Sequence, residues 1–324
     1  MKGDKIIIPV ASGKGGVGKS MLVSNLGIAL AARGYRTTVV DLDLGGSNLH
    51  TCLGLPNRYP GVGDFLKGDG ASQRLSQYLL QTPWNNLSFL PGDGRTPFMA
   101  NIPARQRKQL LDQLGQLPGE IILLDLGAGS ALNTLGFFGM VHRGLLVTSF
   151  ETPAIMNLLS FLKNFSYWII TVVAQHDDAV YQKLTQAFRA TMEMNPVTVN
   201  TLLREVEQLN PQMARTIKER LQQYTPRIVS NMGDRVEDLQ VTEQITRAMQ
   251  HGLSLSPEYF GFIRYDGAVR RSMVEERALT ACAPTSSAAL DVDRLAERLS
   301  KFWQRSIPES AAMLQRSTET MLQS

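Results

Sequence analysis

Hydrophobic residues along this chain form two alternating patterns. Short apolar runs typical of buried strands occur at residues 5–11, 37–41, 87–90, 120–125, 144–148, 227–231 and 259–263. Stretches with helical spacing separate most of them; residues 21–33, for example, place Leu22, Leu26 and Leu30 along one face. This alternation predicts an α/β fold in three layers, with a twisted, mostly parallel sheet between helices on both faces.

A glycine-rich segment joins the first predicted strand to the first predicted helix. Its pattern of small residues, lysine and hydroxyl is that of a phosphate-binding loop, in which backbone N–H groups surround phosphate oxygens, the lysine reaches the β- and γ-phosphates and the hydroxyl binds Mg²⁺. A glycine-rich turn that binds nothing is the alternative, but the flanking strand and helix supply the context that the motif requires. We therefore expect a P-loop NTPase whose nucleotide-binding residues include Gly13, Lys14, Gly15, Gly16, Val17, Gly18, Lys19, Ser20 and Met21.

Acidic residues follow two of the later strands. Asp41 and Asp43 end the run at residues 37–41 and precede two glycines, while Asp125 ends the run at 120–125. Ligands of parallel sheets bind beyond the carboxyl ends of the strands, where such acids hold Mg²⁺ through water or orient an attacking water. A strand-end Asp often only caps the next helix. Two of them after a phosphate loop favour a hydrolytic site, with Asp125 in the Walker B position.

The composition agrees with an enzyme-sized α/β protein. The chain has 324 residues, 43% of them hydrophobic, and a net charge of +4, which permits weak contact with DNA or anionic lipid without requiring it. Cys52 and Cys282 are far apart in the sequence, so neither a zinc site nor a disulfide framework is indicated. We expect a cytoplasmic protein, because no leader-like segment precedes the first strand. Residues 155–174 have the length of a membrane span, but Lys163 and two asparagines favour a buried or partner-facing helix.

The predicted organisation has four parts. Residues 1–174 and 227–305 form the ATPase domain, residues 175–226 form a helical insertion, and residues 306–324 form a flexible tail. Within the insertion we expect helices at 179–193, 197–209 and 211–224, with Leu202, Leu203, Val206 and Leu209 on one face of the second. A partner-docking subdomain and a lid on the core are both compatible with this pattern. Residues 292–303 form either the last packed helix or a membrane-binding helix.

Together these motifs resemble the deviant Walker A, or MinD/ParA-like, family of P-loop ATPases. Residues 14–20, 41–48 and 125–129 carry the resemblance, and residues 228–231 and 261–266 extend it into the C-terminal part. The branch most similar is that of the Min-system and flagellar-number regulators. Two positions depart from the family pattern: Arg264 stands where proline is frequent, and Gly136 stands where an acidic residue is more common.

The resemblance implies roles for individual residues. Lys14 would reach across a dimer interface to the partner's nucleotide, Lys19 would bind the β- and γ-phosphates of its own ATP, and Asp43 would position the hydrolytic water. These three are the implied catalytic residues. Ser20, Asp43 and Asp125 would form the Mg²⁺ site, and Asn231, Tyr265 and Asp266 would surround the adenine.

The resemblance also implies a function. It is that of an ATP hydrolase, slow and stimulated by a partner, that uses ATP-dependent homodimerisation to position or regulate a division site, a flagellum or a DNA cargo. Its cofactors would be ATP and Mg²⁺, and its partners a second copy of itself and an activating protein, with a membrane surface or non-specific DNA as further candidates. It would work in the cytoplasm, or peripherally at the membrane or cell pole. The alternative is a metal-cofactor or iron–sulfur carrier, but Cys52 and Cys282 do not match the bridging positions of that class.

Overall fold

A single mixed sheet organises the molecule. The computed structural model describes residues 5–68, 73–92, 102–190, 198–235, 238, 245–246, 253 and 255–323. Its eight strands lie in the order β3-β4-β2-β5-β1-β6-β7-β8. All neighbours pair in parallel except β3, which runs antiparallel to β4. The strands are β1 (Ile6–Ala11), β2 (Thr37–Leu42), β3 (Leu80–Gln81), β4 (Leu87–Leu90), β5 (Ile121–Leu126), β6 (Leu145–Thr148), β7 (Arg227–Gly233) and β8 (Glu258–Arg264).

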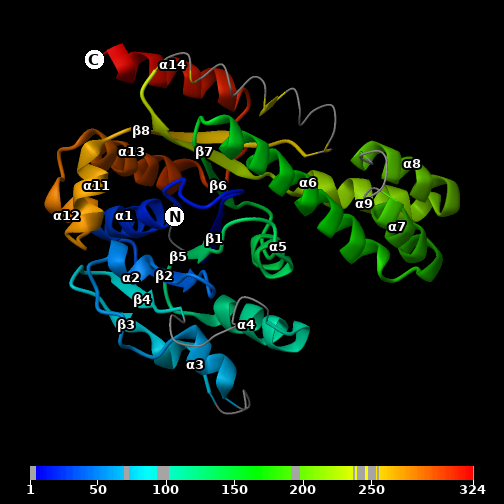
Figure 1. Ribbon diagram of the computed structural model, residues 1–324, viewed down its shortest axis with the longest axis horizontal. Helices are drawn as coiled ribbons and strands as arrows, with labels where there is room; N and C mark the ends of the chain where they lie inside the picture. Colours follow the sequence, from blue (N-terminus) through cyan, green and yellow to red (C-terminus); the bar gives the residue numbers. More distant parts are fainter. Residues whose placement is uncertain are drawn as a thin grey trace.

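Helices cover both faces of the sheet, as Figure 1 shows. Alternate strand residues point into two separate cores. Leu123 lies in the core shared with α1 and α13, while Leu124 lies in the core shared with α4 and α6. The predicted three-layer α/β architecture is thereby confirmed. The helices are α1 (Lys19–Ala32), α2 (Leu49–Cys52), α3 (Val62–Lys67), α4 (Ala104–Gln116), α5 (Leu132–Phe138), α6 (Thr152–Ala174), α7 (Asp178–Ala190), α8 (Val199–Leu209), α9 (Pro211–Gln223), α11 (Gly267–Val274), α12 (Leu279–Cys282), α13 (Ser287–Phe302) and α14 (Ser310–Gln323).

The register of the central strands gathers the functional groups. β2 and β5 are buried along their whole length, which is typical of strands covered on both faces. Asp41 pairs with Asp125 across these two strands, and Val10 of β1 pairs with Asp125 on the other side. Because parallel strands end at the same edge of a sheet, the exit of β1 and the two acids lie at one edge.

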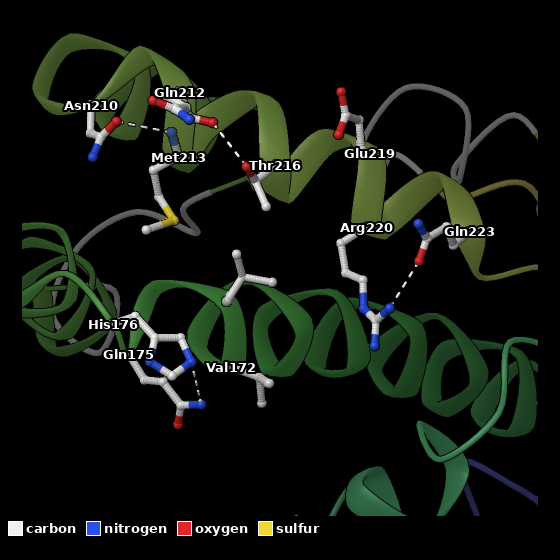
Figure 2. Close-up of a pocket in the computed structure, with 11 residues that line it drawn as sticks. Val172, Gln175, His176, Asn210, Gln212, Met213, Thr216, Glu219, Arg220 and Gln223 are labelled. Atoms are coloured by element: carbon white, nitrogen blue, oxygen red, sulfur yellow. Dashed lines mark hydrogen bonds between the residues drawn. The ribbon is translucent and has the colours of Figure 1, made fainter.

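In the described part of the predicted insertion, α7, α8 and α9 pack beside the sheet against the end of α6 (Figure 1). On α8, Leu202, Leu203 and Val206 are buried as expected, but Leu209 is 52% exposed because the helix ends there. An open groove of about 610 Å³ is lined by residues from the end of α6 and from α9, beside the place where the two helices pack together. Figure 2 shows its polar rim, where Arg220 donates a hydrogen bond to Gln223.

Membrane-spanning character is absent from the helices in the described ranges: none combines sufficient length with sufficient apolar composition. Helix α6, which contains residues 155–174, buries Leu158, Phe161 and Phe165 in the core. The interpretation of this segment as a buried or partner-facing helix agrees with that packing.

The C-terminal region differs from the expected loose tail. Helix α14 packs on β8 and buries Leu314 and Thr318, a buried face with too few apolar residues to stand out in the sequence. Helix α13 packs against α1 and β8 and buries Leu295 and Leu299, as the packed-helix interpretation predicted. The segment between α13 and α14 is therefore held between two packed helices.

A buried arginine fixes that connecting segment to the sheet. The Arg227 guanidinium pairs with Glu258, with 2.9 Å between Nε and Oε2, and donates to the backbone oxygens of Trp303 at 2.9 Å and Arg305 at 2.5 Å. It also stacks between the rings of Phe260 and Trp303, at 4.5 and 4.7 Å from their centroids. Each of the three guanidinium nitrogens thus donates a hydrogen bond, and together they join the first residues of β7 and β8 to the end of α13.

Candidate active site

Glycines in left-handed backbone shape the loop between β1 and α1. Gly16 and Gly18 have φ angles of 85° and 84°, a conformation that side chains disfavour. Gly18 is the N-cap residue of α1, and no side chain caps that helix. The N–H groups of its first turn are therefore left for a ligand, and the helix dipole favours an anion in that position.

Lys19 and Asp125 form a buried ion pair beneath the loop. The distance between Lys19 Nζ and Asp125 Oδ1 is 2.5 Å. The second carboxylate oxygen, Asp125 Oδ2, is buried without a hydrogen-bond partner among the described residues, and so is Ser12 Oγ. Buried polar atoms seldom lack a partner, so each such atom calls for an explanation. A carboxylate oxygen of this kind beside a phosphate loop fits the hydration shell of a nucleotide-bound Mg²⁺.

Asp43 completes the charged cluster. Its Oδ1 atom lies 3.4 Å from the place that a Cβ would take on Gly127, so the glycine after β5 lets the carboxylate approach that loop closely. Burial raises the pKa of Asp43, the charge of Lys19 opposes that rise, and the charge of Asp125 adds to it. The three predicted residues Lys19, Asp43 and Asp125 therefore act on one another at one edge of the sheet.

The carboxylate of Asp41 orders the backbone that follows β2. Its carboxylate accepts hydrogen bonds from Ser47 Oγ at 2.6 Å, from the Asp43 backbone N–H at 3.1 Å and from the Leu49 backbone N–H at 3.2 Å. Burial, followed by the charge of Asp125, raises its pKa to about 7. The capping interpretation of strand-end acids thus describes Asp41, which orders the turn that presents Asp43.

The remaining phosphate-loop residues differ in exposure. Lys14 is exposed, and its charge is a minor factor in lowering the pKa of Glu151, which owes its shift mainly to a hydrogen bond from Ser149. Ser20 is half-buried beside Lys19. The side chain of Met21 points into the core, which leaves its backbone as the part available to a nucleotide. An exposed Lys14 is compatible with its predicted reach toward a second subunit.

The three residues predicted around the adenine are engaged in different ways. Asn231 donates from Nδ2 to the Val17 carbonyl oxygen at 2.8 Å, so it supports the phosphate loop directly. Asp266 caps α11 through Ala268 and also accepts from Ala288 N–H. Tyr265 is 64% exposed. Their contact with a base stays a prediction.

The departure at Arg264 has a local explanation. Its Nε and Nη2 atoms bind the buried carboxylate of Asp291 at 2.9 and 3.0 Å. The arginine therefore ties the end of β8 to α13, a link that proline in this position could not make.

Helix α6 also approaches the site, which the sequence did not indicate. A Cβ on Gly13 would lie 2.2 Å from the backbone oxygen of Asn157, so the loop and the first turns of α6 are in direct backbone contact. Farther along the helix, Asn164 Nδ2 donates to Ser130 Oγ at 2.6 Å. The Gly129 N–H in turn donates to the Ser12 carbonyl oxygen at 2.8 Å. The loop after Asp125 is thus connected both to the phosphate loop and to α6.

This combination of a parallel sheet, an uncapped helix behind a glycine loop, and lysine and aspartate side chains at the strand ends defines a P-loop nucleotide-binding protein. Residues 8–279 match the family described as the CobQ/CobB/MinD/ParA nucleotide binding domain, and the chain belongs to that family. The resemblance drawn from the motifs is confirmed.

Similar proteins come from widely separated organisms. A protein named as septum site-determining protein MinD from Chlorella vulgaris is 34% identical over 158 residues, which are 48% of this chain and 54% of that protein. The flagellum site-determining protein YlxH of Helicobacter pylori is 30% identical over 193 residues, 56% of this chain and 64% of that one. The chain therefore spans less than two thirds of either relative.

A solved structure shows the same fold over nearly the whole chain. The septum site-determining protein MinD from Pyrococcus horikoshii, complexed with Mg-ADP, superimposes with a TM-score of 0.57 at 18% identity. The match covers 92% of this chain and 96% of that one.

Proposed function

We propose that this protein is a Mg²⁺-dependent ATPase that uses ATP to switch between a monomer and a homodimer, and so positions or regulates a cellular structure such as a division site, a flagellum or a DNA cargo. The observation that carries the proposal is the convergence of Lys19, Asp125 and Asp43 beneath an uncapped phosphate loop. Family membership and the site-determining relatives support it.

Each side chain of the site has its own role in hydrolysis. Ser20 Oγ and Asp125 Oδ2 would hold the Mg²⁺ hydration shell, and Mg²⁺, when bound, neutralises charge on the phosphates. Lys19 binds the β- and γ-phosphate oxygens in place of its present partner Asp125. Asp43 accepts a hydrogen bond from the attacking water and orients it toward the γ-phosphate.

The second lysine makes hydrolysis depend on assembly. Because Lys14 is exposed at the loop, it is free to reach the nucleotide of a second subunit, where it stabilises transition-state charge. Turnover is therefore slow in the monomer and rises when an activating protein stabilises the dimer. The switch works in the cytoplasm and, when recruited, at a membrane surface or cell pole.

The test compares wild type with Lys14→Ala and Asp43→Ala, using Lys183→Ala on α7 as the surface control. ATP hydrolysis and molar mass by light scattering are measured with ADP and with ATP. We expect an ATP-held dimer without turnover for Asp43→Ala, a monomer for Lys14→Ala, and wild-type behaviour for the control. A monomer under all conditions in all four proteins would refute the switch.

The iron–sulfur alternative has less support. Burial raises the pKa of the Cys52 thiol to about 12, which disfavours the thiolate that iron requires. Its sulfur lies 3.7 Å from that of Met273. In the part of the chain that the structure describes, no group of three or more histidine, cysteine or acidic side chains could hold a metal.

A further inference from the structure

A groove of about 470 Å³ lies between α13, the segment at residues 303–308 and the first turn of α14. It is remote from the phosphate loop. Glu258, the first residue of β8, accepts hydrogen bonds from Ser306 Oγ at 3.0 Å and from Ile307 N–H at 2.8 Å. The groove therefore lies at the amino edge of the sheet, whereas the phosphate loop lies at the carboxyl edge.

Cationic side chains dominate the rim of this groove. Its lining contains four cations and one carboxylate: Arg294, Arg298, Lys301, Arg305 and Glu297. The first three cations are spaced i, i+4 and i+7 along α13, so they lie on one face of the helix. With a rise of about 1.5 Å per residue, they form a stripe roughly 10 Å long.

Part of this positive charge is uncompensated. Lys301 pairs with Glu297 at 2.5 Å, and Arg294 pairs with Asp291 at 3.0 Å. Arg298 donates a hydrogen bond of 3.5 Å to the Tyr259 backbone oxygen and is influenced by the charge of Glu258. Within the described ranges, however, neither Arg298 nor Arg305 has a carboxylate at ion-pair distance. The Arg305 backbone oxygen is bound by Arg227, but its side chain is exposed.

Apolar side chains line the same groove. Ile307 is only 8% exposed, whereas Phe302 is 41% and Met313 is 53% exposed. Large exposed apolar side chains beside uncompensated cations are typical of interaction surfaces. The segment that carries Ile307 is fixed by the Glu258 hydrogen bonds, so the groove is preorganised and its occupant incurs little ordering cost.

We propose that this groove binds an acidic peptide segment of a partner protein, one that carries a large apolar side chain. The apolar side chain packs between Phe302 and Met313, and the peptide carboxylates bind the stripe of cations on α13. About three extended residues, at roughly 3.4 Å each, cover the length of the stripe. A peptide fits better than a flat membrane, because the apolar atoms line a concave surface between charged side chains.

The experiment uses a fluorescein-labelled ten-residue peptide that alternates glutamate with glycine around one central tryptophan. Binding by fluorescence anisotropy is compared among wild type, Lys301→Glu/Arg305→Glu, Phe302→Ser/Met313→Ser, and the matched control Lys183→Glu/Arg215→Glu on the insertion. Circular dichroism and basal ATP hydrolysis check that each variant is folded, since the groove lies away from the nucleotide site.

We expect micromolar binding that weakens with salt and falls at least about tenfold in both groove variants but not in the control. A peptide with glutamine in place of glutamate should bind wild type no more tightly than the glutamate peptide binds the charge-reversed variant. Equal binding by wild type and the charge-reversed variant overturns the proposal. Absence of peptide binding, together with wild-type binding to phosphatidylglycerol vesicles that the charge-reversed variant loses, also overturns it and assigns the groove to a lipid surface.

Discussion

Asn164, in the middle of α6, donates a hydrogen bond of 2.6 Å to Ser130, five residues beyond the aspartate that pairs with Lys19. The same helix leads directly into the insertion formed by α7, α8 and α9. One helix thus joins the loop that follows Asp125 to the helices α7, α8 and α9.

Replacing Asn164 by leucine should impair hydrolysis more than folding. The lost hydrogen bond contributes about 1 kcal/mol, while the freed Ser130 loop should lower kcat several-fold with little change in KM for ATP. Asn157→Ala is the control on the same helix, because among the described residues its side chain bonds only to the Pro153 backbone oxygen one turn earlier. Steady-state kinetics measure kcat and KM for both variants. Equal kcat values would show that the Ser130 contact has no role in turnover.

Gly13→Ala should disrupt the contact between the phosphate loop and α6. The new Cβ would lie 2.2 Å from the backbone oxygen of Asn157, and backbone atoms cannot rotate away as a side chain does. We expect a loss of about 3 kcal/mol in the free energy of unfolding. Gly15→Ala, which meets nothing within 4 Å, should cost less than about 1 kcal/mol. Urea unfolding of the nucleotide-free proteins makes the comparison, and similar losses would contradict this account of Gly13.

Asp41 should titrate close to neutral pH. Its folded pKa of about 7 lies above the unfolded value of about 3.9. Between these two pH values, Asp41 is therefore still protonated in the native state but ionised in the unfolded state. The free energy of unfolding should consequently fall as pH rises from about 4 to about 7 on account of this residue. Carbon-13 NMR of the Asp41 carboxyl measures the midpoint directly. Asp125→Asn should lower it, because the charge of Asp125 is the second cause of the shift; an unchanged midpoint would leave burial as the sole cause.

Breaking the Arg227–Glu258 pair should be costly. Glu258→Leu leaves a buried guanidinium without its counter-charge, for which we expect a loss of about 3–5 kcal/mol by urea unfolding. Lys218→Ala, which removes the exposed pair with Glu207, should cost less than about 1 kcal/mol. The double change Arg227→Met/Glu258→Leu should recover part of the loss, and a double variant worse than Glu258→Leu alone would argue against the uncompensated charge as the cause.

Local sequence patterns predicted the central part of the fold well. The run at 87–90 coincides with β4, and the run at 37–41 differs from β2 by one residue. These strands are short, consist mainly of apolar and β-branched residues and are bounded by turns, so their local signal is strong. The two-residue strand β3 and helix α14 were missed because their stability comes from packing on β4 and β8.

The candidate site was predictable where a motif carried the chemistry. Lys19, Asp43 and Asp125 were predicted from spacing, and the parallel register brings them together. The roles of Asn164 and Ser12 were not, since a lone asparagine or serine gains its meaning only from a neighbour that is distant in sequence. The strand-end pattern alone did not separate Asp41 from Asp43, and only the family resemblance singled out Asp43. The folded turn supplies the physical reason, because the Asp41 carboxylate already accepts hydrogen bonds from backbone N–H groups.

The contact between α6 and Gly13 determines which residues of this helix can be substituted without disturbing the phosphate loop. Both sides of that contact are main chain, so no side-chain identity on the helix is needed to maintain it. The amino acids on the outer face of α6 are therefore free to be exchanged for a new binding partner while the wall of the phosphate loop stays in place. The partner-facing surface of α6 and the phosphate loop can in this way change independently, although they lie in contact.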